Sequence, residues 1–247
     1  ATTCDYNTAV GMGALKDATT GSDNNAFGRD ALANNTTANS NCAFGSVALF
    51  TQTESGTKNC AFGNQTLYSN TSGDSNCAMG DSALYTNTTG SRNIAIGDYA
   101  MGVNTTGSYN SAFGDSALYN NTTGDGNAAF GLYALYNNTT GLINTAIGTS
   151  ALKDNTTGSY NSAIGYQAMY QNTIGGANVA VGLQALYSNT EGDGNVAVGY
   201  ESLKTLEPSD GLSYNTAVGY QAGLSTTTGE RNIFIGGLAG DALTDAD

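Results

Sequence analysis

The most reactive side chains of this chain are four thiols, three of which recur at nearly equal spacing. Cys42, Cys60 and Cys77 form this series, and Cys4 stands alone near the start. Zinc binding is not expected, because the sequence has no histidine and no C-x-x-C spacing. Thiols on stacked segments lie within reach of a disulfide, but parallel side chains fit its dihedral angle poorly. We interpret the three as small residues in a packed row, with a disulfide between neighbours as the alternative.

Tyrosine recurs at a similar spacing and offers the clearest binding chemistry. A tyrosine ring suits a partly solvent-exposed surface, and a row of such rings can stack on sugar rings. Packing at a seam between subunits is the simpler interpretation of this row, and contact with a cell-surface glycan or receptor is the functional hypothesis. The residues at equivalent places are Tyr68, Tyr85, Tyr119, Tyr136, Tyr170 and Tyr187.

Catalytic and metal-binding chemistry is not predicted. No histidine is available as a general base, and the sequence shows no nucleophile constellation. The acidic turns SGDSN (72–76), TGDGN (123–127) and EGDGN (191–195) resemble calcium-binding loops. Their carboxylates lie in well-separated segments, however, and the GGxGxDx nonapeptide is absent. We therefore expect no catalytic residue, no metal site and no cofactor, and we predict that the protein is not an enzyme.

An internal repeat sets the spacing of all these residues. Counted from its Asn as position 1, the unit reads N-x-A-Φ-G-x-x-A-L-x-x-N-T-T-G-x-x. Eleven of the thirteen intervals between copies equal the length of this unit, and the two longer ones precede Asn59 and Asn215. Position 3 is alanine in thirteen of the fourteen copies. The copies begin at Asn7, Asn24, Asn41, Asn59, Asn76, Asn93, Asn110, Asn127, Asn144, Asn161, Asn178, Asn195, Asn215 and Asn232.

The repeat fills the whole chain, so we predict a single array over 1–247. An irregular insertion near 204–214 contains Pro208, the only proline, and can leave the regular path without breaking it. Both ends break off within the pattern, and we therefore expect a fragment of a longer fibre.

The length of the unit predicts the fold class. Glycines at positions 5 and 15 leave two segments of about five or six residues, which is the length of a strand. Two packed helices would need about 30 residues or more. The prediction is an all-β protein, a parallel β-solenoid (β-roll) of fourteen 17-residue coils.

Each invariant position then has a predicted role. Gly at position 5 suits a corner where φ is positive or two backbones approach closely, and Asn at position 1 can form a ladder of side-chain amides between coils. The N-T-T-G segment fits a second corner. The large residues at positions 4 and 9 are expected inside, which leaves the alanines at positions 3 and 8 as rails that face other subunits. The alternative places the alanines inside, where space is short.

Charge and hydropathy exclude several partners. The formal net charge of −13 would repel nucleic acid and anionic membrane surfaces. No run of 18 apolar residues is present, so membrane insertion is not expected.

Three segments carry a resemblance to a known family. NIAIGDYAMG (93–102), NTAIGTSAL (144–152) and NVAVGYESL (195–203) resemble the S-V-A-I-G-x-x-A repeats of YadA-like head domains in trimeric autotransporter adhesins. The longer unit with N-T-T-G is similar to repeats of bacteriophage-type tail fibres, and TTTGERNIFIGGLAG (226–240) is similar to their final repeats. The resemblance implies a left-handed solenoid, a homotrimer, and an extracellular location on a virion tail fibre or a cell surface.

These observations predict a non-catalytic structural fibre or adhesin-head element for surface attachment or receptor display. One alternative is a subunit of an extracellular filament with end-to-end contacts. Another is an ice-binding solenoid that uses the rows Thr88-Thr89, Thr105-Thr106 and Thr122-Thr123, although adjacent threonines in a strand point to opposite faces.

Overall fold

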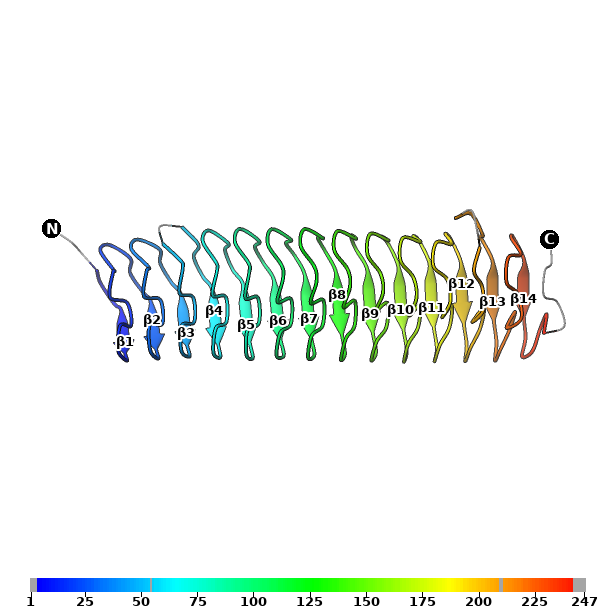
Figure 1. The fold of residues 1–247 in the computed structure, drawn as a ribbon, viewed down its shortest axis with the longest axis horizontal. Coiled ribbons are helices and arrows are strands. Elements are labelled where there is room, and N and C mark those ends of the chain that lie inside the picture. The colour runs from blue at the N-terminus through cyan, green and yellow to red at the C-terminus, as the bar shows by residue number, and fades with distance from the viewer. Residues whose placement is uncertain (1–3, 54, 209–210, 242–247) are drawn as a thin grey trace. The chain divides into compact units, whose positions relative to one another are not determined.

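The computed structural model describes residues 4–53, 55–208 and 211–241, which fall into two compact units, Ala1–Asp125 and Gly126–Asp247. All strands are three residues long, and no helix occurs in these ranges (Figure 1). The first unit holds β1 (Thr8–Val10), β2 (Asn25–Phe27), β3 (Cys42–Phe44), β4 (Cys60–Phe62), β5 (Cys77–Met79), β6 (Ile94–Ile96) and β7 (Ser111–Phe113). The second unit holds β8 (Ala128–Phe130), β9 (Thr145–Ile147), β10 (Ser162–Ile164), β11 (Val179–Val181), β12 (Val196–Val198), β13 (Thr216–Val218) and β14 (Ile233–Ile235).

Successive strands within each unit pair in parallel and in register. In the first unit, the pairing runs from β1 with β2 to β6 with β7. In the second unit, it runs from β8 with β9 to β13 with β14. Equivalent positions of the repeat face each other in every pair, as Ala61 and Ala78 do. Each unit is therefore an all-β parallel β-solenoid in which one copy of the repeat makes one coil, which confirms the predicted fold class.

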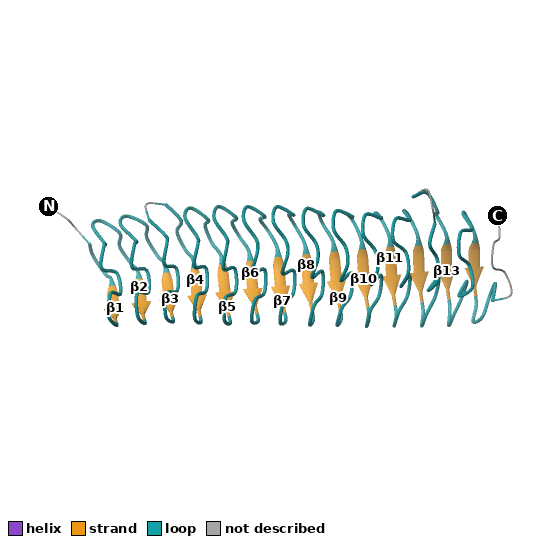
Figure 2. Ribbon diagram, viewed as in Figure 1, coloured by secondary structure: helices purple, strands orange, loops and turns teal. Residues whose placement is uncertain are grey.

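Each coil contains one strand, at positions 2 to 4, and the prediction of two strand-length segments was wrong (Figure 2). The segment after Gly at position 5 cannot be extended, because positions 7 and 9 have positive φ. In the coil that begins at Asn93 these are Tyr99 at 56° and Met101 at 52°. An L-residue pays about 1–2 kcal/mol in this conformation, so packing and hydrogen bonds must hold it there.

The two irregular intervals leave the register intact. The extra residue before Asn59 lies between β3 and β4, which still pair Ala43 with Ala61. The predicted insertion near 204–214 lies between β12 and β13, which pair Ala197 with Ala217. Among its described residues, Leu206 and Pro208 are buried, so the insertion packs onto the coil before the repeat resumes.

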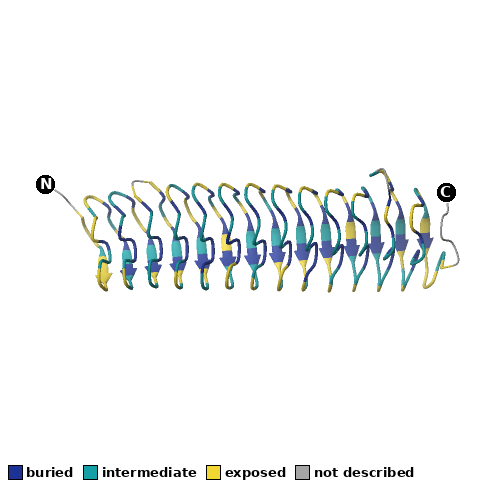
Figure 3. Cartoon of the chain, in the orientation of Figure 1, coloured by how far each residue is buried: buried dark blue, intermediate teal, exposed yellow. Residues whose placement is uncertain are grey.

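The interior of a typical coil is made mostly of alanine with one Leu or Met, and the predicted inward orientation of position 4 was wrong. The alanines at positions 3 and 8 and the Leu or Met at position 9 are buried, as Ala95, Ala100 and Met101 are (Figure 3). The large residues at position 4 point outward, and Met79 is 46% exposed. Strand alternation did place positions 3 and 4 on opposite faces, but a coil this short encloses too little space for two large side chains. The alternative, with alanine inside, is correct.

The exception at position 3 supports this explanation. Phe234 in β14 replaces the alanine and is buried. Position 9 of its own coil and of the preceding coil is glycine, Gly240 and Gly223, in place of the usual leucine. A Cβ at Gly223 would lie 2.7 Å from the Phe234 ring, and one at Gly240 would lie 2.4 Å from it. The large side chain has therefore moved from position 9 to position 3, while the volume inside the coil is kept.

Two rows of buried asparagines join the coils. At position 1, the Asn93 Oδ1 accepts from the backbone N of Asn110 at 3.0 Å, and its Nδ2 donates to the Gly107 carbonyl at 2.8 Å. At position 12, the Asn104 Nδ2 donates to the Asn87 Oδ1 at 2.7 Å and to the same Gly107 carbonyl at 3.0 Å. The predicted ladder at position 1 is thus confirmed, and a second ladder at position 12 accompanies it.

The glycines fit the close approach of stacked backbones. Gly97, at position 5, has φ of 135°, and a Cβ there would lie 2.4 Å from the Gly114 carbonyl oxygen of the next coil. Both reasons predicted for a glycine at this corner therefore hold. At position 15, a Cβ on Gly107 would lie 2.5 Å from the Asn104 Oδ1, so this glycine leaves room for the asparagine ladder.

Asn104→Ala is expected to lower the free energy of unfolding by about 3 kcal/mol, because a buried polar group left without a partner costs about 1–3 kcal/mol and each further hydrogen bond lost costs about 1 kcal/mol. The Asn87 Oδ1 loses its partner. The Asn121 Nδ2 and the Gly107 carbonyl each lose one hydrogen bond but keep another, to Gly124 and from Asn93. Urea denaturation followed by circular dichroism measures the change. Thr106→Ala, at an exposed position of the same coil, is the control and should change stability by less than about 0.5 kcal/mol. Equal stability of the two variants would contradict the role given to the ladder.

Candidate functional site

The predicted tyrosine row forms two stacks on the surface. In the first unit, the rings of Phe50, Tyr68 and Tyr85 stack at centroid distances of 5.3 and 5.1 Å. In the second unit, Tyr170 and Tyr187 stack at 5.2 Å. All of these rings are half-buried, and the rings at the ends of the stacks have a neighbouring ring of the row on one side only.

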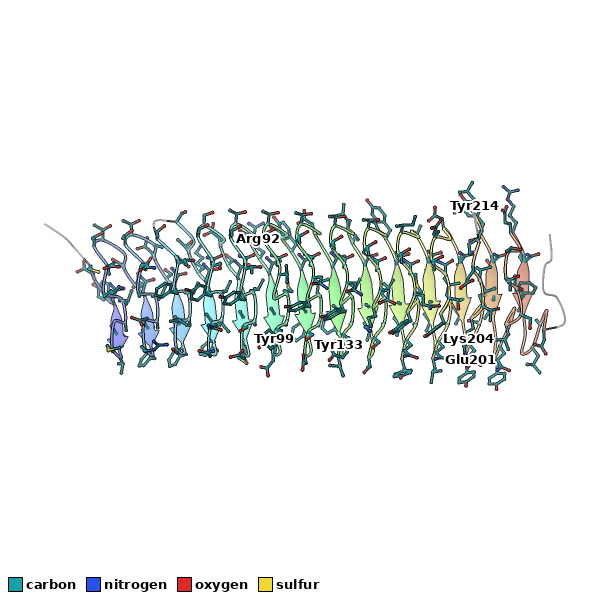
Figure 4. All side chains as sticks on the ribbon, in the orientation of Figure 1. Arg92, Tyr99, Tyr133, Glu201, Lys204 and Tyr214 are labelled. Atoms are coloured by element: carbon teal, nitrogen blue, oxygen red, sulfur yellow. The ribbon has the colours of Figure 1, made fainter. Side chains whose placement is uncertain are left out.

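The two other tyrosines of the row contact rings that the sequence argument missed. Tyr119 meets Tyr99 edge to face at 6.4 Å, and Tyr136 meets Tyr133 edge to face at 5.5 Å. Tyr99 and Tyr133 both occupy position 7, at the turn that follows the strand (Figure 4). Their recurrence at the same position of the repeat was the signal that could have found them. Glycan contact by the row stays a prediction.

Charged residues interrupt the row in the second unit. Lys153 replaces tyrosine at position 10, and its Nζ donates to the Tyr170 hydroxyl at 3.0 Å while lying 5.2 Å from the ring centroid. That hydrogen bond raises the pKa of Lys153. Lys204 at the same position donates to the Glu201 carboxylate at 2.6 Å, which lowers the pKa of that carboxyl group. Figure 4 shows Glu201 and Lys204 together at the same turn.

The three cysteines lie directly opposite one another on β3, β4 and β5. Cys42 pairs with Cys60, and Cys60 pairs with Cys77. All three are half-buried free thiols, and Cys4 is an exposed free thiol. Burial, with a smaller contribution from Cys60, raises the pKa of Cys42 and of Cys77.

The residues at positions 2 and 4 form an outward strand face in each unit, here called the outer apolar face. Its position-4 residues are all apolar, and Phe27, Phe44 and Phe62 stack along it at 4.3 and 5.2 Å. Neither position carries a charged residue in any of the fourteen copies. At the average charge content of 11%, about three such residues would be expected. The face is therefore both exposed and kept free of charge.

The carboxylates of the acidic turns accept hydrogen bonds from the preceding coil. Asp74 and Asp125 each accept a hydrogen bond from the backbone N of the equivalent position in the preceding coil, at 2.6 and 2.7 Å. Asp193 does the same for Gly176 at 2.6 Å. Within the described ranges, no group of three or more Cys, Asp or Glu side chains is placed to hold a metal ion.

The two threonines of the N-T-T-G segment have different surroundings. The Thr88 hydroxyl donates to the Thr105 carbonyl of the next coil at 3.0 Å, while Thr89 is exposed. The same division holds for Thr105 and Thr106. Each of these coils thus presents a single threonine to solvent at this corner, whereas a flat ice-binding row needs Thr-x-Thr pairs.

No helix in the part of the chain that the structure describes has the length and hydropathy to cross a membrane. No family model matches the chain, and neither a curated protein nor a solved structure matches it.

Removal of the Cys60 thiol is expected to lower the pKa of Cys42 and Cys77 toward the ordinary thiol value without reaching it, because burial is the larger cause of the rise. An NMR titration of isotopically labelled cysteine Cβ resonances in Cys60→Ser measures the change. Cys4→Ser is the control and should leave both pKa values unchanged. Unchanged values in Cys60→Ser would show that the thiols do not influence one another.

Proposed function

We propose that this chain is a structural fibre or adhesin-head element that associates with copies of itself. In this proposal it forms a left-handed homotrimer on the outside of a virion tail fibre or a cell, where it serves surface attachment or receptor display. The outer apolar face is the observation that carries the proposal. The resemblance of the repeat to YadA-like heads and tail-fibre repeats supports the number of copies, the handedness and the location.

The chemistry of the outer apolar face fits another copy of the same chain. Position 4 gives this face a row of apolar side chains, and a monomer rarely keeps such a row in water, because covering it is favourable by about 25 cal/mol per Å². Charged residues are excluded from the face although the chain carries a net charge of −13. A second copy offers the same uncharged face with the same spacing, so identical coils can pack level with one another.

The stacked coils suit display because they repeat any surface feature at regular intervals. Identical weak sites on several chains gain strength from their effective concentration. A chain without a catalytic constellation can therefore still attach a particle to a surface.

Light scattering at micromolar concentration is expected to give three times the mass of one chain. The double variant Met79→Glu with Ile164→Glu, which places one charge on the outer apolar face of each unit, should be monomeric with an unchanged circular dichroism spectrum. Thr106→Glu with Thr140→Glu adds the same charge at exposed threonines away from that face, and should remain trimeric. A monomeric wild-type chain would overturn the proposal, and so would a trimeric Met79, Ile164 variant.

A further inference from the structure

Between Phe50 and Tyr119, the aromatic row of the first unit lacks one ring, and a hollow lies there. Position 10 is aromatic at Phe50, Tyr68, Tyr85 and Tyr119, but it is glycine at Gly102. The hollow at this place has a volume of about 310 Å³. Binding sites for small molecules range over about 300–1,000 Å³, so this one has room for a ligand at the small end of that range.

Three rings from three successive coils border the hollow. Tyr85 forms one wall, as the last ring of the Phe50, Tyr68, Tyr85 stack. Tyr119 lies over the backbone of Gly102, where a Cβ would be 2.7 Å from its Cε2. Tyr99, which is 47% exposed, meets Tyr119 edge to face and completes the aromatic surface. The glycine thus converts a continuous stack into a recess with aromatic walls.

The polar groups of the hollow carry no charge. Gln65, Ser82 and Thr86 line it together with the tyrosines, and none of its lining residues is Asp, Glu, Lys or Arg. In the second unit, the equivalent Gln167 and Gln184 bond to each other at 2.8 Å. Gln65 has no such neighbour, because the next coil has Ser82, whose hydroxyl donates to the Asp81 carboxylate at 3.0 Å. The Gln65 amide therefore has donors and an acceptor available for a ligand.

We propose that this hollow binds one neutral pyranose ring, such as the terminal hexose of a glycan. The C–H face of the sugar would stack on the tyrosine rings, and the Gln65 amide would exchange hydrogen bonds with its hydroxyl groups. Anionic sugars are disfavoured, because the hollow offers no cation and the chain has a net charge of −13. This site would supply the receptor contact of the proposed function, and its biological role rests on that proposal. Its binding does not depend on association, since all of its residues belong to one chain.

Saturation-transfer NMR and chemical-shift titration with methyl β-galactopyranoside, methyl β-glucopyranoside and N-acetylneuraminic acid test this assignment. The neutral glycosides are expected to shift the ring signals of Tyr85, Tyr99 and Tyr119 at millimolar concentration, and N-acetylneuraminic acid is not. No shift from either neutral glycoside at tens of millimolar would overturn the proposal. Equal shifts from the anionic sugar would overturn the assigned ligand class.

Two variants test whether the sugar binds in the hollow and not elsewhere along the tyrosine row. Gln65→Ala should weaken binding about tenfold. Gly102→Tyr should abolish binding, because it fills the hollow with the residue that this position carries in neighbouring coils. The φ of Gly102 is not positive, so the backbone accepts tyrosine once the Tyr119 ring, 2.7 Å from the new Cβ, turns aside, and an unchanged circular dichroism spectrum checks the fold.

Tyr187→Ala is the matched control, because it removes a stacked ring of the same row that does not line the hollow. It should bind like the wild type, and a loss as large as that of Gln65→Ala would contradict a site at Gly102. The mass of each sample by light scattering shows separately whether the association proposed above holds, so either proposal can fail without the other.

Discussion

The structure depends on one constraint, which is that equivalent atoms of successive coils must face each other so that buried amides can bond from coil to coil. The Asn93 side chain meets this requirement by joining the backbone N of Asn110 to the Gly107 carbonyl of its own coil. Where the next coil lacks asparagine at position 12, the cost is visible: the buried Oδ1 atoms of Asn35 and Asn189 have no partner within the described residues. Gln52 partly repairs one such break, because its amide accepts from Asn70 and donates to Gly56 in the coil that has one extra residue.

The same constraint decides which side chains may vary. Positions that face inward meet copies of themselves at close range, so they stay small or keep one shape, as the alanines at positions 3 and 8 do. Outward positions face water or another molecule, and their rows can change from coil to coil without disturbing the ladder. A stack of rings can therefore run through Tyr68 and Tyr85, stop at Gly102, and leave a recess where the next coil still pairs in register. Function on such a scaffold arises from departures within an outward row.

Much of the fold could be predicted from the sequence, because a constant repeat length implies stacked coils whose strands pair in the same register. The corner glycines and the asparagines at position 1 followed from the same reasoning. The inward face could not be assigned by hydrophobicity, because it depends on how much space a closed coil leaves, and Ala95 fits where Met79 does not. The left-handed backbone at Tyr99 and Met101 was equally hidden, since neither residue type favours it. The hollow at Gly102 was missed for a different reason: it is marked by a residue that breaks the row, whereas a repeat pattern draws attention to residues that continue it.

Hydrogen exchange of asparagine side-chain amides, followed by NMR, tests the coil-to-coil ladder most directly. The Nδ2 protons of Asn87, Asn104 and Asn121 lie inside the coils and bond to the neighbouring coil, so their exchange should take hours. Those of Asn39, which is exposed, should exchange within seconds. Exchange of the three buried amides at the rate of Asn39 would contradict the account.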